Sequence, residues 1–132
     1  MSLARPKARH HLLLVDDDLD VLDALGTLLE VHGVVVDRAP SGFSALSKLQ
    51  RDQLPCLVLL DIRMPGMSGW DLWAWMRREP TTAAIPVVLI SGEGQDRAAA
   101  QAQGIRDVLR KPVNAEEVVS LVLRYCDQHP PH

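Results

Sequence analysis

Hydrophobic residues in this chain gather into five short runs separated by longer segments of mixed character. The runs cover residues 12–15, 34–36, 56–60, 85–90 and 107–110. The first, third and fourth runs are almost continuous, which is typical of strands covered on both faces. The pattern predicts a sheet whose strands are mostly buried.

Each run is followed by a segment with the helical spacing of hydrophobic residues. The predicted helices cover residues 20–33, 41–50, 68–80, 94–104 and 114–126. Gly33 ends the first helix, Pro80 closes the third, and Asn114 with Glu117 has the spacing of a capping box. Strands that alternate with helices of this length predict an α/β domain with a parallel sheet and helices on both faces.

The composition indicates one globular domain, because the chain has 132 residues of which 47% are hydrophobic. A formal net charge of −3 gives no general basic surface for nucleic acid. No run reaches the length of a membrane span, and the basic start lacks the hydrophobic centre of a signal peptide. We expect residues 1–10 to be a disordered lead, and residues 128–132 to be a tail or the start of a linker.

The two cysteines, Cys56 and Cys126, do not have the spacing of a metal or redox motif. Cys56 lies inside a hydrophobic run and is therefore expected to be a buried thiol. Cysteine usage of this kind agrees with a reducing compartment, so the expected location is the cytoplasm.

Polar residues with metal and phosphate chemistry come directly after the predicted strands. Asp16 and Asp17 follow the first run, Asp61 the third, Ser91 the fourth and Lys111 the fifth. Each alone has an ordinary explanation, such as a turn residue or a solvated lysine. Because ligands of open parallel sheets bind at the carboxyl ends of the strands, the five residues together predict a site at one edge of the sheet.

Four segments resemble the signature blocks of response-regulator receiver domains, the CheY-like domains of two-component signalling. These are LLLVDDD, CLVLLDIRMPGMSGWDL, IPVVLISGEG and RKPV, at residues 12–18, 56–72, 85–94 and 110–113. The resemblance runs from residue 12 to residue 126, and the order and spacing of the blocks also match. It implies a doubly wound, flavodoxin-like receiver domain over residues 11–127, with five helices and five parallel strands in the order 2-1-3-4-5.

The resemblance also implies a role for each acidic residue. Asp61 matches the phospho-acceptor. Asp16 and Asp17 match the acidic pair that, together with Asp61 and the backbone carbonyl of Arg63, holds a divalent cation, Mg²⁺ or Mn²⁺. Asp18 lies one position beyond the pair and is expected to cap the helix that follows.

The phosphoryl group itself is expected to be bound by the Ser91 hydroxyl, the Lys111 ammonium and the backbone N–H of Gly92. An acyl phosphate on a carboxylate nucleophile needs countercharge and hydrogen-bond donors around its oxygens. In the resting state, a salt bridge between Lys111 and Asp61 is expected. The resemblance further implies a cis peptide bond before Pro112, although few X–Pro bonds are cis in general.

Two positions depart from the usual receiver pattern: Val108, and Val113, which stands after Lys111-Pro112 where receiver domains often have phenylalanine. Val108 stands three positions before the lysine, where receiver domains usually carry an aromatic residue that swings inward on phosphorylation. The switch is therefore expected to be muted or to follow a different route. Three tryptophans crowd the 68–80 segment instead: Trp73 is expected in the core, and Trp70 and Trp75 are either partner-surface residues or plain surface aromatics.

Arg63 and Glu93 stand two positions after Asp61 and Ser91, respectively. A salt bridge between them is expected across the mouth through which hydrolytic water approaches the phosphoryl group. This gate predicts a comparatively long-lived phosphorylated form.

The predicted function is that of a phospho-accepting signalling domain rather than an enzyme. A histidine kinase or a histidine phosphotransfer domain would donate the phosphoryl group, and a downstream protein or a fused effector would receive the signal. No direct binding of nucleic acid or membrane is expected, and a homodimer formed on phosphorylation stays open. One alternative is a degenerate receiver that binds partners without phosphorylation. The other is a haloacid-dehalogenase-type phosphohydrolase, whose Asp-x-Asp-x-Thr/Val pattern is incomplete in DDDLD at residues 16–20.

Overall fold

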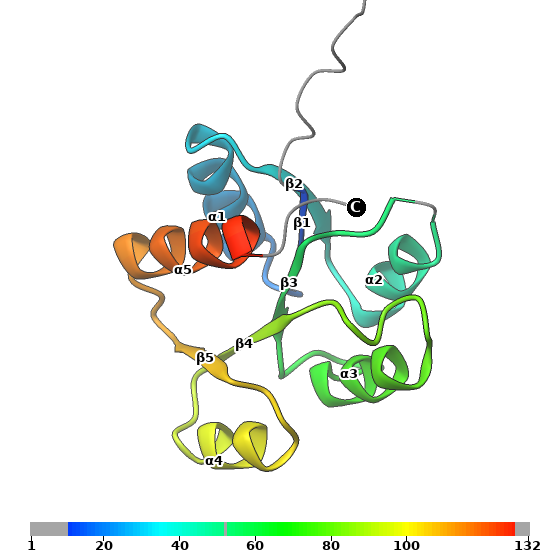
Figure 1. Cartoon of the computed structure of the whole chain (residues 1–132). Helices are drawn as coiled ribbons and strands as arrows, with labels where there is room; N and C mark the ends of the chain where they lie inside the picture. The colour runs from blue at the N-terminus through cyan, green and yellow to red at the C-terminus, as the bar shows by residue number, and fades with distance from the viewer. Residues whose placement is uncertain (1–10, 52, 129–132) are drawn as a thin grey trace, which may run out of the picture.

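The computed structural model describes residues 11–51 and 53–128, in which strands and helices alternate (Figure 1). The strands are β1 (His11–Val15), β2 (Val35–Ala39), β3 (Leu57–Asp61), β4 (Val87–Ser91) and β5 (Asp107–Arg110). The helices are α1 (Leu19–Val31), α2 (Gly42–Leu49), α3 (Gly69–Arg78), α4 (Gln95–Ala102) and α5 (Ala115–Gln128). The predicted lead at residues 1–10 and residues 129–132 of the predicted tail lie outside the described residues.

The five strands form one parallel sheet in the order β2-β1-β3-β4-β5. This is the doubly wound, flavodoxin-like order that the sequence predicted. In Figure 1, α1 and α5 lie on one side of the sheet, and α2 and α3 lie on the other. The winding reverses between β1 and β3, so the carboxyl ends of these two adjacent strands mark the place where such folds bind ligands.

Side chains of β1 alternate between two hydrophobic cores. Leu12 and Leu14 pack in a core with residues of α1 and α5, whereas Leu13 and Val15 pack in a second core with residues of α2 and α3. This alternation follows from the two-residue period of a strand. All four side chains are at most 1% exposed, as expected for a strand covered on both faces.

The starts of four of the described helices carry side-chain caps, and at α2 the cap is Ser41, whose Oγ accepts a hydrogen bond from Ser44 N. Asp18 caps α1 by accepting hydrogen bonds from the backbone N–H groups of the first turn, as predicted. Ser68 caps α3 and forms a reciprocal capping box with Asp71. Before α5, Asn114 Oδ1 accepts a hydrogen bond from Glu117 N at 2.9 Å, which is half of the predicted capping box.

The two cysteines, far apart in the sequence, meet in the core between β3 and α5. Cys56 and Cys126 are both buried, and their sulfur atoms lie 2.6 Å apart. Cys56 is thus a buried thiol, as predicted, and the hydrogen bond from Cys126 lowers its pKa. This pairing could not be predicted, because nothing in the spacing connects the two positions.

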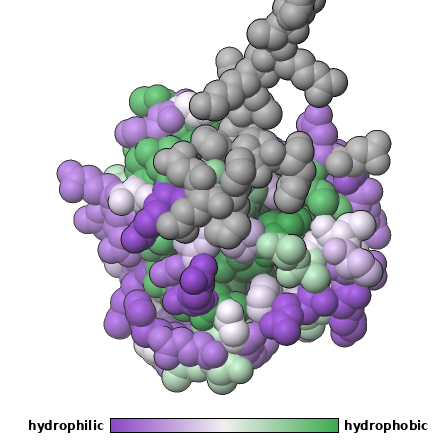
Figure 2. Space-filling view, in the orientation of Figure 1, coloured by the Kyte–Doolittle hydropathy of each residue, from purple (hydrophilic) through white to green (hydrophobic). Residues whose placement is uncertain are grey.

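The surface is mixed in character. Figure 2 shows hydrophilic residues around the outer edge of the face in view and hydrophobic groups nearer its middle. Among the described residues, no helix combines the length and the hydrophobicity needed to cross a bilayer.

Candidate functional site

Three carboxylates meet at the carboxyl edge of the sheet. Because Val15 is paired with Leu60 in the register of β1 and β3, the residues that come next, Asp16 and Asp61, lie side by side. With Asp17, each offers a ligand oxygen, and these three atoms lie within 4.8 Å of one another. The structure thus brings together the three acidic residues that the sequence singled out.

Asp16 is fully buried, yet one of its oxygens has no hydrogen bond. Its Oδ1 accepts a hydrogen bond from Asp18 N at 2.9 Å, whereas its Oδ2 has no hydrogen-bond partner. A buried carboxylate oxygen without a partner costs free energy. Asp61 is also buried and Asp17 is exposed, so the cluster is open to solvent on one side. Two buried carboxylates and one exposed carboxylate fit the oxygen ligands that Mg²⁺ prefers.

Lys111 provides the positive charge of the cluster. It directly follows β5, and its Nζ lies 3.2 Å from Asp61 Oδ1 and 3.5 Å from Asp16 Oδ2. The salt bridge to Asp61 is the one predicted from the sequence. Its backbone N–H donates to Ser91 O at 2.8 Å, and the peptide bond between Lys111 and Pro112 is cis.

Burial and charge act in opposite directions at this cluster. Burial raises the pKa of Asp61, and the charge of Asp16 adds to the rise, while Lys111 opposes it; the net result is a pKa of about 6. Burial lowers the pKa of Lys111, but the two carboxylates raise it by more, so it stays above its usual value. At neutral pH the pair is therefore a carboxylate facing an ammonium.

Ser91 ends β4, next to Asp61 in the sheet, and its hydroxyl is already hydrogen-bonded. It donates a short hydrogen bond to Asp96 Oδ2 and accepts one from Glu93 N at 3.0 Å. Asp96 lies in the first turn of α4 and is 3% exposed. Asp96 is not among the residues predicted from the sequence, where its one signal is an acidic residue in the first turn of an otherwise alanine-rich helix.

Arg63 joins the same network from the loop after β3. Its Nη2 lies 3.2 Å from Glu93 Oε2, 3.0 Å from Asp96 Oδ1 and 3.2 Å from Asp96 Oδ2. The predicted contact between Arg63 and Glu93 is thus present, together with an unpredicted and more deeply buried one to Asp96.

The remaining predicted positions surround this cluster. Gly92 is exposed directly after β4, and Val108 is half-buried in β5, where it packs against the second core. Trp73 is buried, as predicted. Trp70 and Trp75 are half-buried and also pack against the second core, so neither is a fully exposed surface aromatic.

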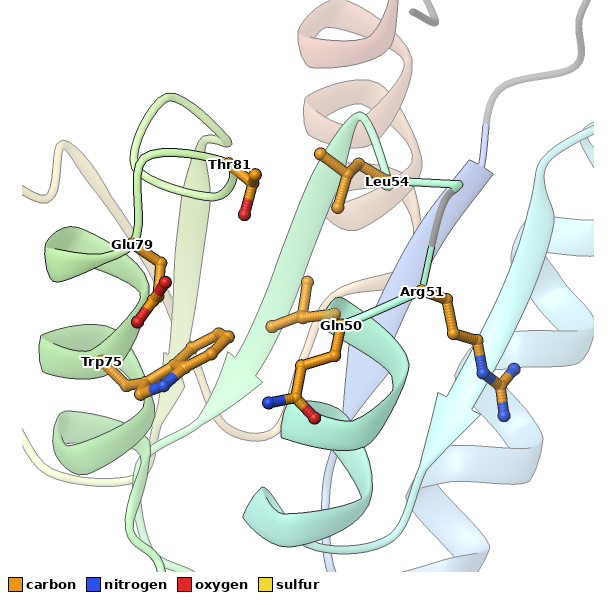
Figure 3. A pocket seen from close by; sticks show the side chains of 7 residues that line it. Gln50, Arg51, Leu54, Trp75, Glu79 and Thr81 are labelled. Atoms are coloured by element: carbon orange, nitrogen blue, oxygen red, sulfur yellow. The ribbon is translucent and has the colours of Figure 1, made fainter.

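A separate pocket lies between α2 and α3 (Figure 3). It has a volume of about 410 Å³, and Trp75 lies on one side of it, with Gln50 on the other. Leu54 lines it as well and precedes β3, whereas Asp61 ends that strand. The pocket is therefore at the opposite edge of the sheet from the acidic cluster.

Comparison with known proteins agrees with this geometry. The family model described as response regulator receiver domain matches residues 12–123. An uncharacterised 14.6 kDa protein of Leptolyngbya boryana is 39% identical over 94% of this chain and 95% of its own length. Protein PilH of Pseudomonas aeruginosa is 34% identical over 84% of this chain and 93% of its own length.

A crystal structure of a candidate response regulator from Chloroflexus aurantiacus superposes with a TM-score of 0.84. The two sequences are 32% identical, and the match covers 91% of this chain and 99% of the other. Neither a degenerate binding module nor a haloacid-dehalogenase-type hydrolase is favoured by these matches. The chain belongs to the family of response regulator receiver domains.

Proposed function

We propose that this receiver domain accepts a phosphoryl group on Asp61 in a Mg²⁺-dependent transfer from a histidine kinase or a histidine phosphotransfer domain. The observation that carries the proposal is the position of Asp61, buried at a strand end beside Asp16 and Asp17 and 3.2 Å from Lys111 Nζ. The phosphorylated form then changes the surface that a downstream protein or a fused effector recognises.

The transfer is a displacement at phosphorus. A carboxylate oxygen of Asp61 forms a bond to the phosphorus while the bond to the donor imidazole breaks, and the imidazole leaves with that electron pair. With a pKa of about 6, Asp61 is mostly ionised at neutral pH and can act as the nucleophile. Lys111 supplies positive charge to the phosphoryl oxygens, and the Ser91 hydroxyl and the Gly92 N–H supply hydrogen bonds.

Asp16, Asp17, Asp61 and the backbone carbonyl of Arg63 would hold the Mg²⁺ ion, or Mn²⁺ in its place. Asp16 Oδ2 supports this assignment, because it is buried without a hydrogen bond and its ion pair with Lys111 Nζ is 3.5 Å long, so a divalent cation would give it a closer partner. When bound, the ion supplies countercharge to the carboxylates and to the transferred group.

The proposal describes a signalling domain that assists its own phosphorylation and dephosphorylation, acting in the cytoplasm without direct contact to nucleic acid or membrane. A dimer that forms on phosphorylation is one way to transmit the signal. A degenerate receiver would keep the fold and bind partners without phosphate. A phosphohydrolase would turn over small phosphomonoesters.

The test is to incubate the chain with acetyl phosphate and Mg²⁺ and to measure its intact mass. We expect a gain of one phosphoryl group, and no gain for Asp61→Asn or when the metal is chelated. Asp71→Asn, a substitution of an exposed aspartate at the start of α3, is the matched control and should be phosphorylated normally. Equal phosphorylation of Asp61→Asn would refute the assignment, and turnover of p-nitrophenyl phosphate would favour the hydrolase.

A further inference from the structure

The mechanism proposed above leaves one buried charge without a role. Asp96 is 3% exposed and lies in the first turn of α4. Its Oδ2 accepts the Ser91 hydroxyl hydrogen bond, and both of its oxygens contact Arg63 Nη2, at 3.0 and 3.2 Å. A buried carboxylate is stable only when such partners satisfy it.

The Ser91 hydroxyl has a single hydrogen to donate. Two acceptors lie within reach of it, the Asp96 carboxylate and the Glu93 carbonyl at 3.2 Å. The charged acceptor forms the stronger bond. While the Ser91 hydroxyl donates this hydrogen to Asp96, it cannot donate it to a phosphoryl oxygen on Asp61.

Arg63 is also held by Asp96 in a way that competes with a phosphoryl group. A guanidinium suits the geometry of phosphate oxygens, and this one stands two positions after Asp61. In the structure it is held instead by Asp96 and by the exposed Glu93. Glu93 and Asp96 thus form ion pairs with a guanidinium that a phosphoryl group on Asp61 would also attract.

We propose that Asp96 is a positioning residue that holds Ser91 and Arg63 in the unphosphorylated protein and competes with the phosphoryl group for both. The inference rests on the proposed phosphorylation of Asp61. Phosphorylation then has to break the hydrogen bond between Ser91 and Asp96, because Ser91 has only one hydrogen to give.

The competition also supplies a route for the signal. When Asp96 loses its partners it becomes a buried, unsatisfied charge, which is costly, so the first turn of α4 has to move. Release of Asp96 thus connects the phosphoryl site to α4.

The test compares two variants by their affinity for beryllofluoride, a phosphoryl mimic, in the presence of Mg²⁺. Asp96→Asn keeps the size of the side chain but removes the charge. We expect about tenfold tighter binding of the mimic, because the mimic no longer has to break the charge-assisted hydrogen bond between Ser91 and Asp96. Glu93→Gln removes a contact of Arg63 but leaves the carboxylate that holds Ser91, so a smaller change is expected. Unchanged or weaker binding by Asp96→Asn would overturn the proposal.

A second measurement reads the contact without any phosphoryl mimic. Amide hydrogen exchange of residues 91–97 should be faster in Asp96→Asn than in the native chain, and equal exchange would count against the role of Asp96. In the native chain, binding of beryllofluoride should change exchange in the same residues, so the proposal stays testable even if the variant does not fold. If acetyl phosphate and beryllofluoride both fail to act on the native chain, the proposed function fails, whereas the exchange of Asp96→Asn still reports on the contact.

Discussion

Lys111 Nζ lies 3.2 Å from Asp61 Oδ1, although β4 separates the strands that carry the two residues. Even this close ammonium does not cancel the effect of burial on Asp61. Burial, with the charge of Asp16, raises the pKa of Asp61 from 3.8 to about 6. The Asp61 carboxylate is therefore held in a place where its own charge disfavours folding.

A dependence of stability on pH follows. Between about pH 4 and pH 6, the folded chain binds a proton on Asp61 that the unfolded chain has released, so the free energy of unfolding falls as the pH rises through this window. Asp61→Asn removes the effect. Without Mg²⁺, we expect its melting temperature to exceed that of the native chain at pH 7 and the difference to shrink toward pH 4.

Thermal unfolding between pH 4 and pH 8 in a chelating buffer makes this measurement. Lys111→Met is the complementary variant, because loss of the ammonium should raise the pKa of Asp61 further and move the window to higher pH. An Asp61→Asn variant that is less stable than the native chain at pH 7 would show that the ion pair outweighs burial.

Binding of Mg²⁺ should depend on which carboxylate of the acidic run is altered. We expect Asp17→Ala to weaken binding most, because the resemblance makes Asp17 a direct ligand, and Asp16→Asn to weaken it as well. Asp18→Asn is the matched control: Asp18 caps α1 instead of joining the cluster, and asparagine caps equally well. Its Mg²⁺ affinity should stay within about twofold of the native value, since the cap is preserved.

Titration followed by tryptophan fluorescence or by calorimetry gives these affinities. An Asp17→Ala variant with an unchanged Mg²⁺ titration would remove Asp17 from the ligand set. An Asp18→Asn variant that loses binding would place the ion one residue further along the chain.

The lifetime of the phosphorylated form should depend on Arg63. Replacing both Arg63 and Glu93 by alanine should speed hydrolysis of the Asp61 acyl phosphate, because we expect the salt bridge between them to hinder the approach of water. Glu93→Ala alone should have less effect, since Asp96 still holds Arg63 at 3.0 Å. Loss of radiolabelled phosphate after removal of the donor measures the rate, and equal or slower loss from the double variant would mean that no gate exists.

Val108 predicts where the structural response is small. With no ring to relocate in β5, beryllofluoride should change amide exchange mainly after Ser91 and in α4. Substitution of Val108 by tyrosine should add changes in β5 and at the start of α5, because it restores the ring. Large changes around β5 and α5 in the native chain, with none after Ser91, would contradict the prediction.

Gly69 is expected to tolerate no side chain. A Cβ at this position would lie 2.5 Å from Asp61 O and 2.8 Å from Ile62 Cα, and backbone atoms cannot move aside cheaply. Gly69→Ala should lower the free energy of unfolding by about 1–3 kcal/mol. Urea unfolding measures this, with Gly92→Ala as the control because its Cβ would meet no atom within 4 Å; equal stabilities would contradict the packing argument.

Much of the fold followed from hydrophobic patterning, and the misses have physical causes. The predicted strand 34–36 is β2 at Val35–Ala39, an edge strand. Its polar residues Asp37 and Arg38 pair with Lys48 and Glu30, so the run of hydrophobic residues ends before the strand does. The strand order came from the resemblance, because periodicity does not determine which strands are neighbours.

The candidate site likewise contains residues that could be predicted from the sequence and residues that could not. Asp16, Asp61 and Lys111 could be placed together because parallel strands end at one edge. Asp96 could not, since its contact with Ser91 depends on a side chain that reaches back from a helix whose other residues are ordinary. The contact between Cys56 and Cys126 could not be predicted for a similar reason, because only the packing of α5 against β3 brings the two sulfur atoms together.

The close approach of Gly69 to the backbone of Asp61 also affects how the motif DIRMPGMSG should be read. Its first residue, Asp61, is the proposed phospho-acceptor, whereas its last residue, Gly69, leaves room for the start of α3 to pass the Asp61 carbonyl. A chain that lost its phosphorylatable aspartate but kept α3 in this place would still need the glycine. A glycine at the end of the motif therefore indicates how the start of α3 packs, and it does not by itself indicate phosphorylation. A redesign of this fold for another reaction must keep Gly69 even if Asp61 is replaced.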